Sequence, residues 1–162
     1  MKKLAVLALA ATMSVSAFAV NIGIVDSQEV FMKYSGTKTI QAELVKEKEK
    51  LENDIRSKEV ELQKLGIELQ GKGPKVTEAE KESYNKQAQA LDKFVRESQQ
   101  KLSQKEYQSM TGIQTNIDAS IQSIAKKSKY DYVLEAGAVK FGGTDITQQV
   151  IKMMENTKKI DL

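Results

Sequence analysis

GKGPKVTEAE, residues 71–80, separates two long segments of helical composition. Its two glycines and Pro74 are the residue types that disfavour a continuing helix most strongly. Thr77 to Glu80 then has the Thr-x-x-Glu pattern of a capping box, with Thr77 as the N-cap of a new helix. The sequence therefore predicts a helical hairpin whose tip lies near residues 71–77.

The segment before this turn, from Thr37 to Gln70, has the pattern of a coiled-coil helix. It is rich in Lys, Glu, Gln and Leu, lacks Pro, and repeats its apolar residues in heptads. The a positions are Ile55, Leu62 and Leu69, the d positions are Leu44, Leu51 and Leu65, and the polar exceptions on the same seam are Gln41, Lys48 and Lys58. At about 1.5 Å per residue, this segment projects roughly 50 Å.

The segment after the turn predicts a second helix, from about Glu78 to Lys127. Its apolar residues recur at intervals of three and four, which places them on one helical face. They are Tyr84, Ala88, Leu91, Val95 and Leu102, followed by Met110, Ile113, Ile117, Ile121 and Ile124. Two antiparallel helices with so narrow a seam form an arm rather than a globule. The 14 basic and 14 acidic side chains between Ile40 and Met110 cancel, so the arm is close to neutral.

Short β-rich runs lie on either side of this hairpin. Asn21 to Val25 predicts a strand, and Asp26 is placed to cap a short helix that Gly36 interrupts or bends. After the hairpin, Tyr130 to Leu134 predicts a second strand, and Val139 to Phe141 predicts its hairpin partner. The two ends of the chain should therefore meet in one small body.

A final amphipathic helix completes this body. Asp145, with Gln148 three residues later, predicts its N-cap. The expected core residues of the strands are Ile22, Ile24, Val133, Leu134, Val139 and Phe141, and those of the last helix are Ile146, Val150, Ile151, Met153 and Met154. So small a core would gain from burial against copies of itself, so some of these side chains should face neighbouring subunits. The fold class is α+β, mostly α, with a β-stranded oligomerisation body and a long antiparallel hairpin arm.

The first residues have the three parts of a secretory signal peptide. A cationic Met1-Lys2-Lys3 precedes an apolar run, and Ala17-Phe18-Ala19 is a small-x-small cleavage pattern. The apolar run is shorter than the roughly 20 residues that span a bilayer, so export is favoured over a membrane anchor. We expect cleavage after Ala19 and a periplasmic location, with a body formed by 20–36 and 108–162 and an arm formed by 37–107.

Composition excludes several kinds of chemistry. The chain has no Cys and no His, which leaves no thiolate or imidazole for a zinc site, a disulfide or a nucleophilic triad. Asp26 and Asp145 each open a helix and have no apparent acid-base partner, so we expect no enzyme activity, no cofactor and no metal. Cleavage removes Lys2 and Lys3 and lowers the formal charge from +3 to +1, which argues against a nucleic-acid partner.

The chain resembles the Skp-like (OmpH-like) periplasmic chaperones over nearly all of its mature length. The resemblance lies in Ile22-Gly-Ile-Val-Asp26 before a charged hairpin, then Tyr130-Asp-Tyr-Val-Leu134, an Ala-Val-x-Phe run ending at Phe141, and Asp145-Ile-Thr147. It implies a jellyfish-like homotrimer whose arms enclose a cavity and hold unfolded outer-membrane proteins without ATP. It also implies contact of the arm tips with membrane surfaces, although acidic residues stand among the tip lysines here.

Three aromatic residues of the second helix are candidates for client binding: Tyr84, Phe94 and Tyr107. Packing within the hairpin is the simpler interpretation of each, although Val95 beside Phe94 widens the apolar stripe beyond what the seam requires. A different class of function stays open as well. The hairpin would also suit a structural coiled-coil adaptor of the envelope that docks on one folded partner.

Overall fold

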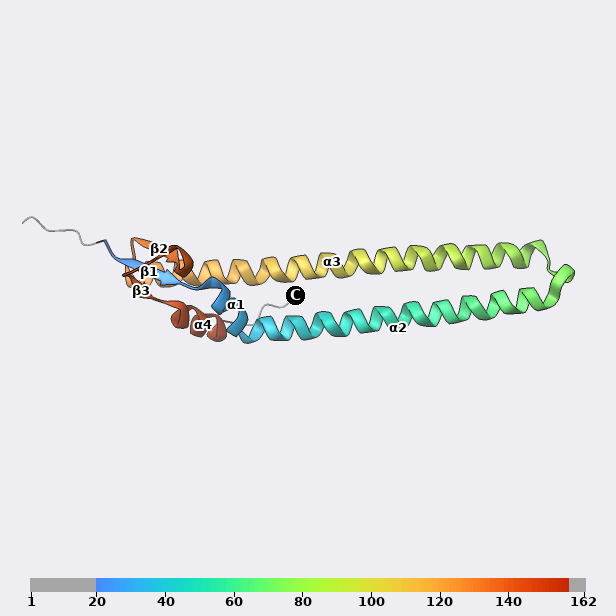
Figure 1. Cartoon of the computed structure of the whole chain (residues 1–162), viewed down its shortest axis with the longest axis horizontal. Helices are drawn as coiled ribbons and strands as arrows, with labels where there is room; N and C mark the ends of the chain where they lie inside the picture. The colour runs from blue at the N-terminus through green and yellow to red at the C-terminus, as the bar shows by residue number, and fades with distance from the viewer. Residues whose placement is uncertain (1–19, 158–162) are drawn as a thin grey trace, which may run out of the picture.

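Two long antiparallel helices form most of the molecule. The structure is a computed structural model that describes residues 20–157, and the expected signal peptide, residues 1–19, lies outside them. Helix α2 (Ser35–Lys72) and helix α3 (Glu78–Ser128) run side by side along the long axis (Figure 1). The coiled-coil hairpin predicted from the sequence is confirmed, with α2 two residues longer than expected at each end and α3 one residue longer at its C-terminus.

The tip of the hairpin has the predicted turn. Helix α2 ends at Lys72, the short 3-10 helix η1 (Gly73–Lys75) follows, and Gly73 adopts a φ of 51°, which favours glycine. Both hydrogen bonds of the capping box are present: Thr77 Oγ1 accepts from the Glu80 amide at 3.3 Å, and the Thr77 amide donates to Glu80 Oε2 at 2.9 Å. The second helix therefore starts where the sequence places it.

The seam of the hairpin follows the predicted heptads. The apolar a and d residues of α2 from Leu51 to Leu69 are half-buried, and Leu44 is buried. On α3 the stripe departs from the prediction at one position: Met110 is 40% exposed, and its neighbour Ser109 is buried in its place. The small serine lets α3 approach the base of α2, where a methionine side chain would hold the two helices apart.

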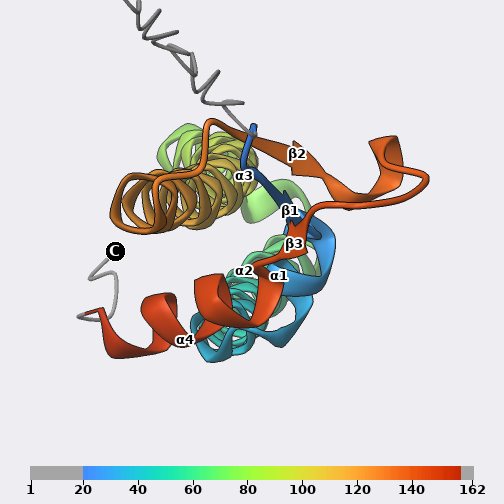
Figure 2. The same cartoon turned by 90° about the vertical axis from the view of Figure 1, so that its left-hand side faces the viewer.

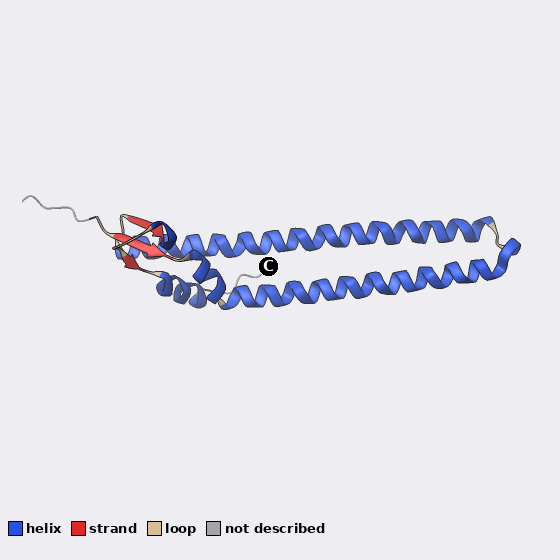
Figure 3. Cartoon of the chain, viewed as in Figure 1, coloured by secondary structure: helices blue, strands red, loops and turns tan. Residues whose placement is uncertain are grey.

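The body is a three-stranded sheet covered by helices. Strand β1 (Ile22–Val25) lies between β2 (Tyr132–Glu135) and β3 (Thr144–Asp145), and it is parallel to both. Helices α1 (Ser27–Lys33) and α4 (Thr147–Asn156) lie about the start of α2, whereas β2 lies near the end of α3 (Figures 2 and 3). The core joins these elements through Val25, Val30, Tyr34, Ile113, Ile117, Ile124, Ile146, Val150 and Met154, all of them buried.

The predicted β-hairpin after α3 is wrong. Residues 139–141 form no strand, and the 3-10 helix η2 (Ala136–Ala138) is the first part of a crossover to the far side of β1. A tight hairpin would make its two strands antiparallel neighbours, whereas β2 and β3 are both parallel to β1 and lie on opposite sides of it. Gly142 and Gly143, with φ of 87° and 88°, allow the chain to return for β3. Phe141 is consequently 99% exposed rather than a core residue of this chain.

Two helix boundaries also differ from the sequence prediction. The break after α1 lies at Tyr34, and Gly36 is in the first turn of α2 instead of at the break. The buried ring of Tyr34 occupies the space that a side chain at Gly36 would need. The N-cap of α4 is Ile146, one residue after the expected Asp145. The division into body and arm near residue 108 stays a prediction, since α3 crosses this position without a break.

Candidate functional site

The distal arm is the candidate surface for holding other chains. From Val45 to Glu97 no residue is buried, because each helix has only the other to pack against. Several large apolar side chains lie well exposed there, with exposed fractions of 55% for Val45, 42% for Val60 and 62% for Ile67. They are scattered among charged residues rather than gathered in one patch, which suits many weak contacts better than a single deep one.

Ion pairs along the helices keep this surface charged and soluble. Lys86 pairs with Glu82 at 2.8 Å and Arg96 with Asp92 at 2.5 Å, each one turn apart on α3. Lys101 of α3 reaches Glu47 of α2 at 3.1 Å and lowers the pKa of that carboxyl, chiefly through its hydrogen bond. Exposed pairs of this kind contribute at most about 1 kcal/mol each, so they do not stiffen the arm.

Phe94 lies in a groove between the two helices of the arm. The groove has a volume of about 330 Å³, and its lining combines apolar Leu62, Leu91 and Phe94 with charged side chains such as Lys58 and Glu61. The Lys58 ammonium lies 5.2 Å from the centre of the Phe94 ring, close enough for a cation–π contact. A lysine on the coiled-coil seam thus covers the aromatic ring with a flexible and charged side chain.

The other two aromatic candidates have different surroundings. Tyr84 packs inside the hairpin: a Cβ at Gly66 of α2 would lie 3.4 Å from its ring, which favours the packing interpretation. Tyr107 is 73% exposed and borders a groove of about 610 Å³ along α3. Because ten and thirteen residues separate the three side chains in one helix, they lie on the order of 15–20 Å apart and form no single pocket.

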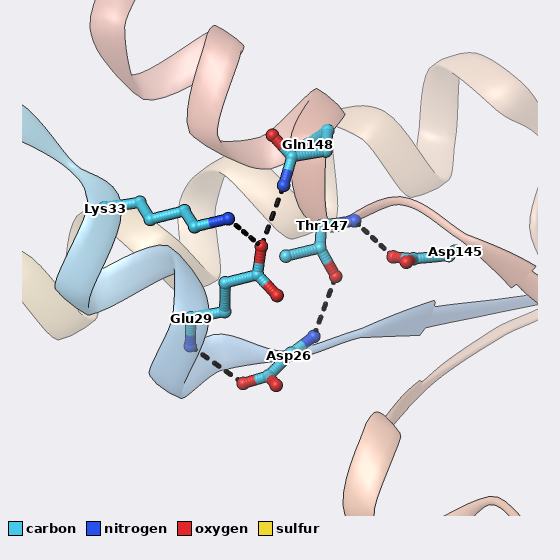
Figure 4. A network of polar contacts seen from close by, with 6 residues as sticks. All are labelled: Asp26, Glu29, Lys33, Asp145, Thr147 and Gln148. Atoms are coloured by element: carbon cyan, nitrogen blue, oxygen red, sulfur yellow. Dashed lines mark hydrogen bonds and ion pairs between the residues drawn. The ribbon is translucent and has the colours of Figure 1, made fainter.

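A polar network joins the two ends of the chain in the body (Figure 4). Asp26 is the N-cap of α1: its Oδ1 accepts from the Glu29 amide at 2.8 Å, and its own amide donates to Thr147 Oγ1 at 3.0 Å. Asp145 Oδ1 accepts from the Thr147 amide at 2.8 Å, and hydrogen bonding by Thr147 lowers the pKa of that carboxyl. These aspartates order the backbone where α1 and α4 begin.

Gln148, which was expected to complete the cap of α4, bonds to Glu29 of α1 instead. Gln148 Nε2 donates to Glu29 Oε1 at 2.8 Å, and Lys33 Nζ donates to the same oxygen at 2.8 Å (Figure 4). Within residues 20–157, no cluster of three acidic side chains is arranged to hold a metal ion. The carboxylates of this region act as structural hydrogen-bond acceptors.

Glu155 provides a cap that the sequence did not reveal. Its carboxylate accepts from the Ser35 amide at 2.6 Å and from Ser35 Oγ at 2.6 Å, at the N-terminus of α2. Tyr34, the N-cap residue, makes no side-chain cap bond, and its pKa is raised by burial and by the nearby Glu155 charge. Helix α4 therefore fixes the base of the arm. No local pattern could have indicated a partner so far away in the sequence.

The remaining body candidates divide into two groups by exposure. Ile22, Ile24, Val133 and Val139 are half-buried within the chain. Leu134 is 41% exposed, and its neighbour on the same face of β2, Tyr132, is 62% exposed. Phe141, at 99%, is a third exposed apolar side chain among the described residues of the body.

No helix within residues 20–157 has the length and apolar content needed to cross a membrane.

A sequence profile described as outer membrane protein (OmpH-like) matches residues 21–154. "Chaperone protein Skp" of Yersinia enterocolitica and that of Pectobacterium atrosepticum are each 28% identical over 162 residues, covering 92% of this chain and 93% of each relative. A crystal structure of a putative outer membrane chaperone (OmpH-like) from Caulobacter crescentus has a TM-score of 0.64 over 89% of both chains at 16% identity, which supports the fold alone. The chain belongs to the OmpH-like outer membrane protein family.

Proposed function

We propose that this protein is an ATP-independent holdase chaperone of the periplasm. It binds unfolded outer-membrane β-barrel proteins between its helical arms and prevents their aggregation during transit. Family membership and the two relatives called Skp support a chaperone role, and the signal-peptide pattern of residues 1–19 supports the location.

The absence of any buried residue from Val45 to Glu97 is the observation that carries this proposal. A holdase must grip unrelated chains and release them without chemistry, which favours many weak contacts. An arm with few buried contacts opens and bends locally at low cost in free energy. Its lysine and glutamate stems add apolar area while their charged ends stay in water.

The proposal includes a homotrimer that encloses a cavity. β2 and β3 are both edge strands of the sheet, and exposed edges readily pair with or pack against other chains. Tyr132 and Leu134 of β2 are exposed apolar side chains, and so is Phe141 in the crossover that follows. Assembly through the body would bury this surface and leave the arms free. Contact of the arm tips with anionic membranes stays a prediction, which cosedimentation with anionic vesicles tests.

An aggregation assay tests the holding activity. A denatured β-barrel membrane protein is diluted from urea into buffer without nucleotide, and light scattering is followed with and without the mature chaperone. We expect a several-fold excess of chaperone to suppress scattering. Unchanged aggregation would contradict the proposal and favour a structural adaptor, which binds one folded protein tightly and ignores unfolded ones.

Substitutions in the arm test which residues touch clients. Phe94→Glu places a charge in the inter-helix groove, and Tyr107→Ser removes an exposed ring. If either residue contacts clients, its variant should suppress aggregation less than the wild type at equal helix content and equal mass. Glu59→Gln, on the exposed surface of α2, is the matched control. If a correctly assembled variant suppresses aggregation as well as the wild type does, the substituted residue is not part of the client-binding surface.

A further inference from the structure

The groove around Phe94 contains two charged side chains that form no ion pair. Its charged lining residues are Lys58 and Glu61 of α2 and Lys93 and Glu97 of α3. Lys93 and Glu97 pair with each other at 3.7 Å. Within residues 20–157, Lys58 and Glu61 take part in no ion pair, although they are three residues apart on one helix. The groove therefore has one unpaired cation and one unpaired carboxylate.

The Phe94 ring already binds the unpaired cation. Lys58 Nζ lies 5.2 Å from the ring centre, within the range of cation–π attraction. Lys58 is exposed, so its flexible side chain can turn into water without leaving a buried space behind. The ring itself is half-buried, and half-buried Leu62 and Leu91 line the same groove. Movement of Lys58 would thus uncover an aromatic face in an apolar setting, with Glu61 in the same groove.

An arginine side chain suits such a site better than a lysine does. Its guanidinium is planar and more weakly hydrated than an ammonium, so it stacks on an aromatic ring with less loss of hydration. Its N–H groups also form charge-assisted hydrogen bonds with a carboxylate, and Glu61 is the unpaired carboxylate of this groove. Lys58 competes from the same chain at high effective concentration, which keeps the binding of any one arginine weak and reversible.

We propose that the Phe94 groove binds arginine side chains of unfolded clients, and that Lys58 is the resident cation that each arginine displaces. The proposal rests on the holding function proposed above and names one chemical feature of the clients, an arginine beside an apolar residue. The guanidinium replaces the Lys58 ammonium over the ring and pairs with Glu61, and the apolar neighbour contacts Leu62 and Leu91. Because one cation replaces another, the client binds and leaves without chemistry.

Two matched peptides test this exchange. Both are fluorescein-labelled, unstructured glycine-serine peptides with several Leu-Arg pairs, and in one of them citrulline, the neutral analogue of similar shape, replaces every arginine. Fluorescence anisotropy measures the dissociation constant of each peptide for the mature full-length protein. Lys58→Gln removes the resident ammonium, and Lys64→Gln removes the same charge from α2 outside the groove lining. Both positions are exposed, and far-ultraviolet circular dichroism checks that both variants keep their helix content.

We expect Lys58→Gln to bind the arginine peptide several-fold more tightly than the wild type does, with little change for the citrulline peptide. Equal binding of the two peptides by Lys58→Gln would overturn the proposal. An equal gain in Lys64→Gln would also overturn it, because the gain would then be a general effect of charge. Adding Phe94→Leu to Lys58→Gln keeps an apolar side chain but should abolish the gain, and a gain that persists would overturn the role of the ring.

The aggregation assay separates this proposal from the holding function. If the wild type suppresses aggregation but Lys58→Gln shows no preference for the arginine peptide, the arginine site is wrong and the holding function stands. If the wild type leaves aggregation unchanged, the holding function is wrong whatever the peptides show.

Discussion

Gly36 lies at the junction between body and arm, and its lack of a side chain leaves room for the ring of Tyr34. A Cβ at this position would lie 2.3 Å from Cε1 of Tyr34, whose ring is only 2% exposed. Gly36→Ala should therefore lower the free energy of unfolding by about 1–3 kcal/mol through overpacking, although alanine favours helices. Gly71→Ala is the control, because no atom lies within 4 Å of its added Cβ. In urea titrations Gly71→Ala should be neutral or stabilising, and an equal loss in both variants would contradict the argument.

Glu155 is the second residue whose effect extends beyond its own helix. Removing its carboxylate leaves the Ser35 amide and hydroxyl without their acceptor at the start of α2. Glu155→Ala should cost about 0.5–2 kcal/mol, the range measured for lost N-caps. Glu59→Ala, on the exposed surface of α2, should cost less than about 0.5 kcal/mol in the same urea titration. Similar midpoints for the two variants would show that the cap contributes little.

Residues with local partners could be predicted from the sequence, and residues with distant partners could not. Asp26 and Thr77 bond to amides three residues later, so their pattern is visible in a short window. Glu155 bonds to a residue 120 positions away, and Thr147 bonds across 121 positions. Only the fold brings these pairs together, and Glu, Ser and Thr recur at many other positions of the chain.

At the scale of elements, an ion pair between Lys72 and the titratable carboxylate of Glu80 joins the two helices at the hairpin tip. Lys72 Nζ lies 2.5 Å from Glu80 Oε1, and this bond, together with those from Thr77, lowers the pKa of Glu80 from 4.5 to about 2. The stabilising contribution of ionised Glu80 is thus complete above pH 4.5 and is lost as the pH falls toward 2. A carboxyl titration by nuclear magnetic resonance should place Glu80 near the lower value. Lys72→Gln should raise the Glu80 pKa, whereas Lys81→Gln, which removes the partner of Glu78, should not.

Equivalent apolar substitutions should have unequal effects in the arm and in the body. Ile113 is 0% exposed in the core, so Ile113→Ala should lower the free energy of unfolding by about 2–5 kcal/mol. Leu62 is a half-buried seam residue, and the space left by Leu62→Ala opens to solvent, so its loss should be about 1 kcal/mol. Denaturant midpoints of the two variants provide the comparison. A larger loss at Leu62 would show that the arm is tightly packed in the assembled protein.

The sequence predicts long elements well and short ones less well. Heptads repeat over many turns, so the extents of α2 and α3 were predicted within two residues. The strands have four residues or fewer, and alternation in so short a run indicates extended backbone but not its partner. Val139 to Phe141 alternates as a strand would, yet the parallel order β2-β1-β3 requires a crossover at this point. Strand orientation depends on contacts with β1, more than 100 residues earlier.

At the scale of the whole molecule, stability and surface exposure are separated along the long axis. The buried apolar side chains of the core gather at the body and the base of the arm, whereas no residue from Val45 to Glu97 is buried. Free energy of folding is therefore concentrated where copies could assemble. The distal arm can bend or open locally without weakening the body. This arrangement suits the proposed function, in which the arms hold clients and the bodies assemble.

Two substitutions should separate assembly from client holding. Leu134→Glu puts a charge on the apolar surface of β2, which is 41% exposed in the single chain, so the monomer should keep its helix content. Because a buried unpaired charge is costly in an interface, the proposed trimer should dissociate toward monomer, which light scattering would detect as a lower mass. Ile67→Ser removes an apolar side chain that is 62% exposed on the arm, and it should keep the trimer mass but suppress aggregation less well. If Leu134→Glu remains trimeric, β2 does not form the interface, and if Ile67→Ser holds clients fully, Ile67 is not part of the gripping surface.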